Sequence, residues 1–107
     1  MSQAAAHRFA LAAALAALVV LALPARANEA LAEKHACLNC HDLNKKMVGP
    51  AFTTVAQRYR SQADAQALLA KKIAEGGSGV WGAVAMPPMP QVPEPDRRTL
   101  VAWLLGL

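Results

Sequence analysis

The sequence is poor in aromatic side chains and in long apolar runs. It contains two Trp, two Phe and one Tyr, too few to build a row of rings on which nucleic-acid bases could stack. Its longest apolar run, residues 9–23, would span about 22 Å as a helix, which is less than the roughly 30 Å hydrocarbon core of a bilayer. These shortages argue against a nucleic-acid partner and against a retained membrane anchor.

The apolar run instead has the surroundings of a secretory signal peptide. It follows a short start that carries Arg8, and it is followed by the small-residue cleavage pattern ARA at residues 25–27. We therefore predict a cleaved signal peptide over residues 1–27 and a single domain over residues 28–107, exported to the bacterial periplasm without stable membrane insertion. Cleavage removes two basic residues, so the formal net charge of +4 is a poor guide to partners.

A domain over residues 28–107 is short and usually needs a disulfide, a metal or a cofactor, because it buries only roughly 60–65% of its unfolded surface. Its only two cysteines, Cys37 and Cys40, lie in the stretch CLNCH, with His41 directly after the second. Four kinds of site fit a C-x-x-C pair. They are a redox dithiol, half of a zinc site, a disulfide and, with the adjoining His, an attachment site for c-type haem.

Three of these four interpretations conflict with the rest of the sequence. A thioredoxin-like dithiol needs a scaffold of strands and helices, which the pattern lacks. A structural zinc ion needs four ligands, and although His35 is also available, the adjacent Cys40 and His41 rarely bind one ion together. A disulfide closing so small a ring gives little loop entropy. Haem attachment accounts for the whole motif, since two thiols add to the vinyl groups of one porphyrin and His41 then lies under the iron.

Hydrophobic periodicity predicts an all-α domain of about four short helices. Apolar residues recur at i, i+3, i+4 and i+7 in several segments, and no stretch alternates over five residues. Residues 76–93, rich in Gly and Pro, read as a long loop, and loops of that length are often functional. The expected helices cover residues 28–36, residues 51–60, residues 65 to the glycine pair at 76–77, and the segment from 94 onward, with Glu94, Pro95 and Asp96 in its first turn.

A haem iron bound by His41 leaves a sixth coordination position to fill. The candidate ligands are the thioethers of Met47, Met86 and Met89 and the imidazole of His35. Met47 follows His41 too closely to reach the opposite face of a haem, and His35 is expected on the surface of the first helix. Met86 and Met89 both lie in the stiff segment AMPPMP, and spacing alone does not separate them.

Several motifs in this order resemble the small bacterial class I cytochromes c of the cytochrome c-551 type. The resemblance covers almost all of residues 28–107, and the motifs together are far more specific than C-x-x-C-H alone. It implies the class I cytochrome c fold, in which about four short helices surround one covalently bound haem c. The motifs are CLNCH, KMVGPAF starting at Lys46, GVWG starting at Gly79, MPP starting at Met86, and Leu100 with Trp103-Leu104.

The resemblance also implies roles for residues around the haem. Met86, which opens the MPP triplet, would be the axial ligand opposite His41. Pro50 would lie beside His41, with a nearby main-chain carbonyl accepting a hydrogen bond from Nδ1–H of the imidazole. Trp81 would donate its indole N–H to a haem propionate, and Lys72 would help to hold the propionates.

Two positions depart from the family pattern. Relatives of this type commonly have Asn directly after Met-Pro-Pro, where its side chain can hydrogen-bond the ligand sulfur, and this chain has Met89 there. We therefore expect that hydrogen bond to be absent. The last helix begins Pro93-Glu94-Pro95, where a Ser cap is more usual.

Iron with His and Met ligands has no open position, which predicts an electron-transfer protein rather than an enzyme. A thioether ligand favours Fe(II), so the reduction potential should be high. The resemblance implies a cytochrome bc complex as donor, and a cytochrome cd-type nitrite reductase, a cytochrome oxidase or a peroxidase as acceptor. A monomer would dock weakly through the exposed haem edge. The residues expected around that edge are Met47, Val48, Val84, Pro87 and Pro88.

Two other functions remain open at this point. A haem-based gas-binding or peroxidase-like protein would have the same attachment motif but a labile sixth ligand. A subunit that delivers electrons to a dehydrogenase would have the same haem site within a stable complex. The ferric spectrum separates the first alternative from an electron carrier, because an open iron site is high-spin.

Overall fold

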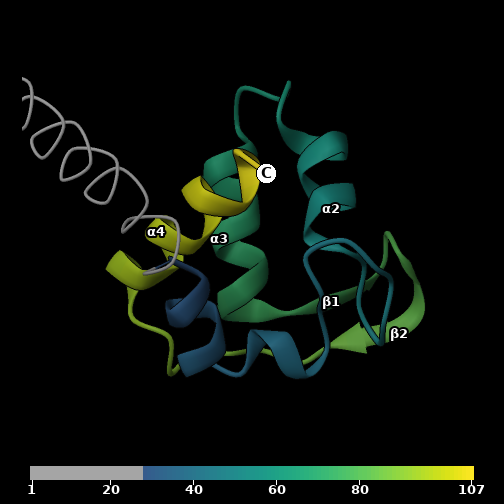
Figure 1. Cartoon of the computed structure of the whole chain (residues 1–107), viewed down its shortest axis with the longest axis horizontal. Helices are drawn as coiled ribbons and strands as arrows, with labels where there is room; N and C mark the ends of the chain where they lie inside the picture. Colours follow the sequence, from purple (N-terminus) through teal and green to yellow (C-terminus); the bar gives the residue numbers. More distant parts are fainter. Residues whose placement is uncertain (1–27) are drawn as a thin grey trace, which may run out of the picture.

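The computed structural model describes residues 28–107, and the predicted signal peptide lies outside the described residues. In this part of the chain no helix is long and apolar enough to cross a membrane. Three helices and a small hairpin surround the centre of the molecule, with the first helical segment packed below them (Figure 1). The elements are a helix over residues 28–34, the 3-10 helix η1 (Cys37–Asn39), α2 (Phe52–Tyr59), α3 (Ala65–Glu75), β1 (Gly77–Gly79), β2 (Gly82–Met86) and α4 (Glu94–Leu105).

Helices α2 and α3 form where the periodicity of apolar residues predicts them. The four apolar residues of α2 at i, i+3, i+4 and i+7, from Phe52 to Tyr59, are all buried. Helix α3 ends at Gly76, whose φ of 67° lies in the left-handed region that glycine adopts without a Cβ clash. Gly76 is therefore the residue that turns the chain out of α3 and into the hairpin.

Helix α4 packs against both α2 and α3 (Figure 1). It begins after Pro93 without a side-chain cap, and Glu94 and Asp96 lie in its first turn, as predicted. Carboxylates there interact favourably with the positive end of the helix dipole, which partly replaces the missing cap. The rings of Phe52 and Trp103 meet edge to face with centroids 5.8 Å apart, so the start of α2 is fixed against α4.

The apolar interior has two parts. The larger cluster joins α2, α3 and α4, with Val101 fully buried among residues such as Val55 and Leu69. The smaller cluster consists of Ala32, Val92 and Leu100, and it joins the first helical segment to the chain just before α4 and to α4 itself. The first helical segment and α4 are therefore held together by apolar contacts, beside the cavity described below.

A two-stranded hairpin occupies part of the segment that the sequence predicted as a loop. The all-α class is correct for the helices, but β1 and β2 pair antiparallel, with Gly77 opposite Met86 and Gly79 opposite Gly82. Nearly all the hairpin residues are exposed, so no alternation of buried and exposed side chains could reveal the strands. The two strands are held together by main-chain hydrogen bonds. Because β1 consists only of Gly and Ser, its sequence shows no apolar pattern.

Candidate haem site

A cavity of about 990 Å³ opens between the CLNCH segment, the helices and the hairpin. This volume lies at the upper end of the range of about 300–1,000 Å³ typical of small-molecule sites. The fold brings together in its walls residues that lie far apart in the sequence. All seven site residues named from the sequence line it: Cys37, Cys40, His41, Pro50, Lys72, Trp81 and Met86.

The CLNCH segment folds as a tight turn. The carbonyl of Cys37 accepts hydrogen bonds from the N–H groups of Cys40 at 3.3 Å and His41 at 3.0 Å. The turn starts at Ala36, whose φ of 60° is left-handed, a conformation that costs a residue with a Cβ roughly 1–2 kcal/mol. The two cysteines are not joined by a disulfide, and burial raises the pKa of the Cys37 thiol. The strained turn places both thiols and the imidazole on one wall of the cavity.

The imidazole of His41 is held by three neighbours. Its Nδ1 lies 2.7 Å from the carbonyl oxygen of Pro50. Because a carbonyl only accepts hydrogen bonds, Nδ1 donates to it, and Nε2 is the ring nitrogen left for a metal. The ring stacks on Phe52 with centroids 4.9 Å apart, and a Cβ at Gly49 would lie only 2.5 Å from Cε1 of the ring. The arrangement presents an imidazole with a fixed orientation, which suits metal ligation.

The loop that follows His41 returns Pro50 to the imidazole. The carboxylate of Asp42 accepts hydrogen bonds from the N–H groups of Asn44 at 2.8 Å and Lys45 at 2.9 Å, and these bonds lower the pKa of Asp42. The N–H of Gly49 then donates to the carbonyl of Cys40 at 2.8 Å. The loop is thus closed at both ends, which explains why a carbonyl nine residues along the chain meets the ring.

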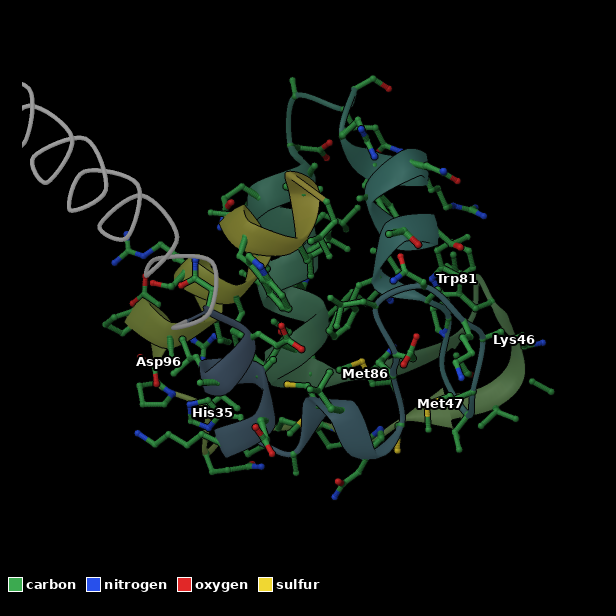
Figure 2. The ribbon with its side chains drawn as sticks, viewed as in Figure 1. His35, Lys46, Met47, Trp81, Met86 and Asp96 are labelled. Carbon is green, nitrogen blue, oxygen red and sulfur yellow. The ribbon has the colours of Figure 1, made fainter. Side chains whose placement is uncertain are left out.

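The two candidate thioethers have different surroundings, although both residues line the cavity. Met86 ends β2 and lies near the centre of the molecule in Figure 2. Met89 donates its N–H to the carbonyl of Ile73 at 3.0 Å, and its side chain packs against the smaller apolar cluster that contains Val92. The geometry therefore favours Met86 as the thioether available to a cofactor, a choice that spacing alone left open.

The other two candidate ligands have surroundings that differ from those of Met86. Met47 is 47% exposed and lies beside Lys46 at the hairpin side of the molecule (Figure 2). His35 lies on the opposite side, where its Nε2 is 2.8 Å from Oδ2 of Asp96 (Figure 2). His35, expected on the surface of the first helix, is largely covered: its side chain is 12% exposed and faces a carboxylate.

Lys72 and Trp81 reach the cavity from α3 and from the tip of the hairpin. Trp81 is 38% exposed, so it is not a core aromatic. The sequence did not single out Arg58, whose guanidinium lies 5.0 Å from the centroid of the Trp81 ring. No motif marks this contact, and the only sequence signal is the position of Arg58 next to Tyr59, which ends the buried face of α2.

Comparisons with known proteins agree with this architecture. The sequence model of the cytochrome c family matches residues 25–107. The chain is 47% identical over 93 residues to cytochrome c-552 of Hydrogenobacter thermophilus. The alignment covers 87% of this chain and 94% of that protein. It is 46% identical over 89 residues to cytochrome c-551 of Allochromatium vinosum, covering 83% of this chain and 95% of that protein.

A solved structure gives the same result for the fold. The crystal structure of wild-type cytochrome c552 from Nitrosomonas europaea superimposes with a TM-score of 0.72 at 43% identity. The match covers 74% of this chain and 98% of that chain. The helices of the class I cytochrome c fold are therefore present here together with the small hairpin.

The fold and the CLNCH site define a protein that binds a c-type haem. The chain belongs to the cytochrome c family. Its relatives are small monohaem cytochromes c, and the predicted fold class, the single covalently attached haem c and the role as an electron carrier rather than an enzyme are confirmed.

Proposed function

We propose that this protein is a periplasmic one-electron carrier between membrane respiratory complexes and terminal reductases or oxidases. In this proposal Cys37 and Cys40 would attach the haem, and His41 and Met86 would hold its iron. The observation that supports it most is that one cavity is lined both by the His41 imidazole, whose Nδ1 is bound to a carbonyl, and by the Met86 thioether, which comes from the end of β2.

The residues of the cavity fit a haem c. Two thiols would attach the porphyrin through its vinyl groups, and an oriented imidazole and a thioether would supply the two donors to its iron. When bound, the haem supplies the one-electron couple of its iron. The Pro50 carbonyl holds the His41 ring and increases its basicity as a ligand. The thioether of Met86 favours the ferrous state, which raises the reduction potential.

The other cavity residues control access and charge. Phe52, Val55 and Leu69 contribute apolar surface to the wall, which keeps water out of the interior. Trp81 and Lys72 would donate hydrogen bonds to the haem propionates. If His41 and Met86 both hold the iron, no coordination site would be left for a substrate or for O₂, and electrons would pass through the exposed edge.

The docking surface that we propose is the exposed apolar rim of the cavity. Met47 is 47% exposed, Val48 58% and Val84 67%, and Pro87 and Pro88 are exposed beside them. Large apolar side chains grouped on a small surface usually mark an interaction site. A contact of this kind suits brief encounters with a cytochrome bc complex as donor, and with a cytochrome cd-type nitrite reductase, an oxidase or a peroxidase as acceptor.

The test combines a spectrum with a rate. The ferric haem protein should be low-spin with a weak sulfur-to-iron band near the red end of the spectrum, and the ferrous protein should not bind CO. Val84→Asp should slow electron transfer from a purified cytochrome bc complex at least severalfold. Ala102→Asp, an equal charge change at an exposed position of α4 outside the cavity, should not.

The opposite results would exclude the proposal. A high-spin ferric spectrum with rapid CO binding would indicate the gas-binding or peroxidase-like alternative. Equal electron-transfer rates for the unchanged protein and for the variants Val84→Asp and Ala102→Asp would show that the docking surface lies elsewhere.

A further inference from the structure

The tip of the β1–β2 hairpin has little apolar packing of its own. Both strands are exposed along almost their whole length, and Val80 at the tip is 42% exposed. The base of the hairpin continues directly from α3 through Gly76. The tip, which carries Trp81, therefore needs another contact to hold it against the body of the protein.

Two side chains of α2 supply this contact. The Trp81 ring meets Tyr59 edge to face, with centroids 6.4 Å apart and an interplanar angle of 65°. The guanidinium carbon of Arg58 lies 5.0 Å from the centroid of Trp81 and 5.8 Å from that of Tyr59. A planar guanidinium stacks on aromatic faces and is attracted by their negative charge density.

The next arginine, Arg60, follows the last residue of α2 and has a different environment. Arg60 donates from its guanidinium to the main-chain oxygen of Leu107 at 3.0 Å and to that of Ala56 at 3.2 Å. Arg58 takes part in none of the ion pairs found among residues 28–107. Its guanidinium is thus directed to the aromatic pair, whereas that of Arg60 is directed to the main chain.

We propose that Arg58 is a positioning residue that latches the hairpin tip to α2 by stacking on Trp81. The latch fixes the indole at the edge of the cavity and brings a positive charge to that edge. Because oxidation of the iron adds a positive charge to the site, a nearby cation favours the reduced state and raises the reduction potential. This inference rests on the proposed role of Trp81 at the haem edge.

The experiment uses the haem-loaded protein and four variants. Arg58→Gln removes the latch and its charge, and Arg58→Lys keeps the charge. Arg60→Gln makes the same charge change at the residue directly after α2, and Trp81→Phe tests the indole. Amide hydrogen exchange of residues 77–86 reports the latch, and the midpoint potential at several salt concentrations reports the charge. A cation–π contact at an exposed site predicts hairpin exchange about twofold to fivefold faster in Arg58→Gln.

The expected pattern differs between the variants. Arg58→Gln should speed hydrogen exchange in the hairpin and lower the midpoint potential. Arg58→Lys should lower the potential less. Arg60→Gln should leave hairpin exchange unchanged and should change the potential only by an amount that added salt removes. Unchanged hairpin exchange in Arg58→Gln, or equal effects of Arg58→Gln and Arg60→Gln, would overturn the latch. Equal potential losses in Arg58→Gln and Arg58→Lys would overturn the role of the charge.

The variant Trp81→Phe separates this inference from the proposed function. A lower potential in Trp81→Phe supports the indole as a haem contact. If its potential is unchanged while Arg58→Gln still speeds exchange of the hairpin, the proposed role of Trp81 is wrong but the latch remains.

Discussion

Nε2 of His35 lies 2.8 Å from Oδ2 of Asp96, 61 positions further along the chain. The contact joins the end of the first helical segment to the first turn of α4. The two side chains are 12% and 28% exposed, so water weakens this pair less than it weakens a surface ion pair. Together with the Ala32, Val92 and Leu100 cluster, it holds the two ends of the domain together.

This contact predicts a stability difference between two carboxylates of α4. Asp96→Asn should lower the free energy of unfolding by about 0.5–1.5 kcal/mol, because it weakens a partly buried hydrogen bond. Glu94→Gln makes the same charge change in the same turn, but its partner Arg98 is 3.5 Å away and both side chains are more than 60% exposed. Denaturant unfolding of the haem protein should show almost no effect for this control. Equal losses would indicate the helix dipole rather than the pair with His35.

The second prediction concerns the space beside the His41 ring. In Gly49→Ala the new Cβ would lie 2.5 Å from Cε1 and 2.8 Å from Nδ1, so the ring or the loop must shift. We expect a loss of about 1–3 kcal/mol in unfolding free energy and changed NMR signals of the His41 ring. Gly106→Ala is the control, because its Cβ would come no nearer than 3.5 Å to another atom. An unperturbed ring in Gly49→Ala would show that the loop has slack at this position.

The third prediction separates the two thioethers. Met86→Leu should abolish the sulfur-to-iron band, open the iron to CO and lower the potential. Met89→Leu should keep the band and cost less than about 1.5 kcal/mol of stability, because leucine nearly preserves the volume that packs against the smaller cluster. The near-equal volumes make these two variants matched controls for each other.

A third variant tests the departure from the family pattern at the same loop. Met89→Asn should supply the missing side-chain donor and shift the NMR signal of the Met86 methyl without changing the ligand. If Met89→Leu loses the band and Met86→Leu keeps it, the ligand assignment is reversed.

The fourth prediction concerns haem attachment. Cys37→Ala or Cys40→Ala should leave one thioether bond, and the double variant should lose covalent haem and be largely unfolded. The reason is that the cavity of about 990 Å³ leaves the small domain without a filled centre. Mass spectrometry and circular dichroism check both statements. A double variant that folds without haem would show that the two apolar clusters suffice for the fold.

The fifth prediction concerns the N-terminus of the exported protein. Periplasmic material should have the mass of residues 28–107 plus one haem. A membrane-bound species that keeps residues 9–23 would instead show that the apolar run is retained as an anchor.

The sequence predicted the features that depend on local pattern. The periodicity from Phe52 to Tyr59 and the glycine that follows α3 predicted these helices correctly, because helix formation depends directly on the spacing of apolar residues and on the residues at the helix ends. The site motif CLNCH was equally readable. The hairpin was missed, because strands made of exposed Gly, Ser and Ala have no buried face to produce alternation.

The contacts that no local pattern encodes came only from the structure. The pair of His35 and Asp96 joins residues that the sequence separates by nearly the whole domain. The stacking of Arg58 on Trp81 depends on how the hairpin folds back on α2. Contacts of this kind follow from the tertiary arrangement, and the residues themselves are ordinary members of their helices or turns.

The close approach of Gly76 to the site sets an order of events in unfolding. A Cβ at this position would overlap the carbonyl oxygen of Met86, and the N–H of Met89 donates to the carbonyl of Ile73 at 3.0 Å. The segment that carries the proposed ligand is thus joined to the last turn of α3 by one hydrogen bond, and Gly76, directly after α3, packs closely against the Met86 carbonyl. To carry the Met86 backbone away from the cavity, denaturant must first fray that turn. We therefore expect the loss of the proposed Met86–iron bond during unfolding to depend on the contacts at Gly76 and Met89 rather than on the strength of that bond.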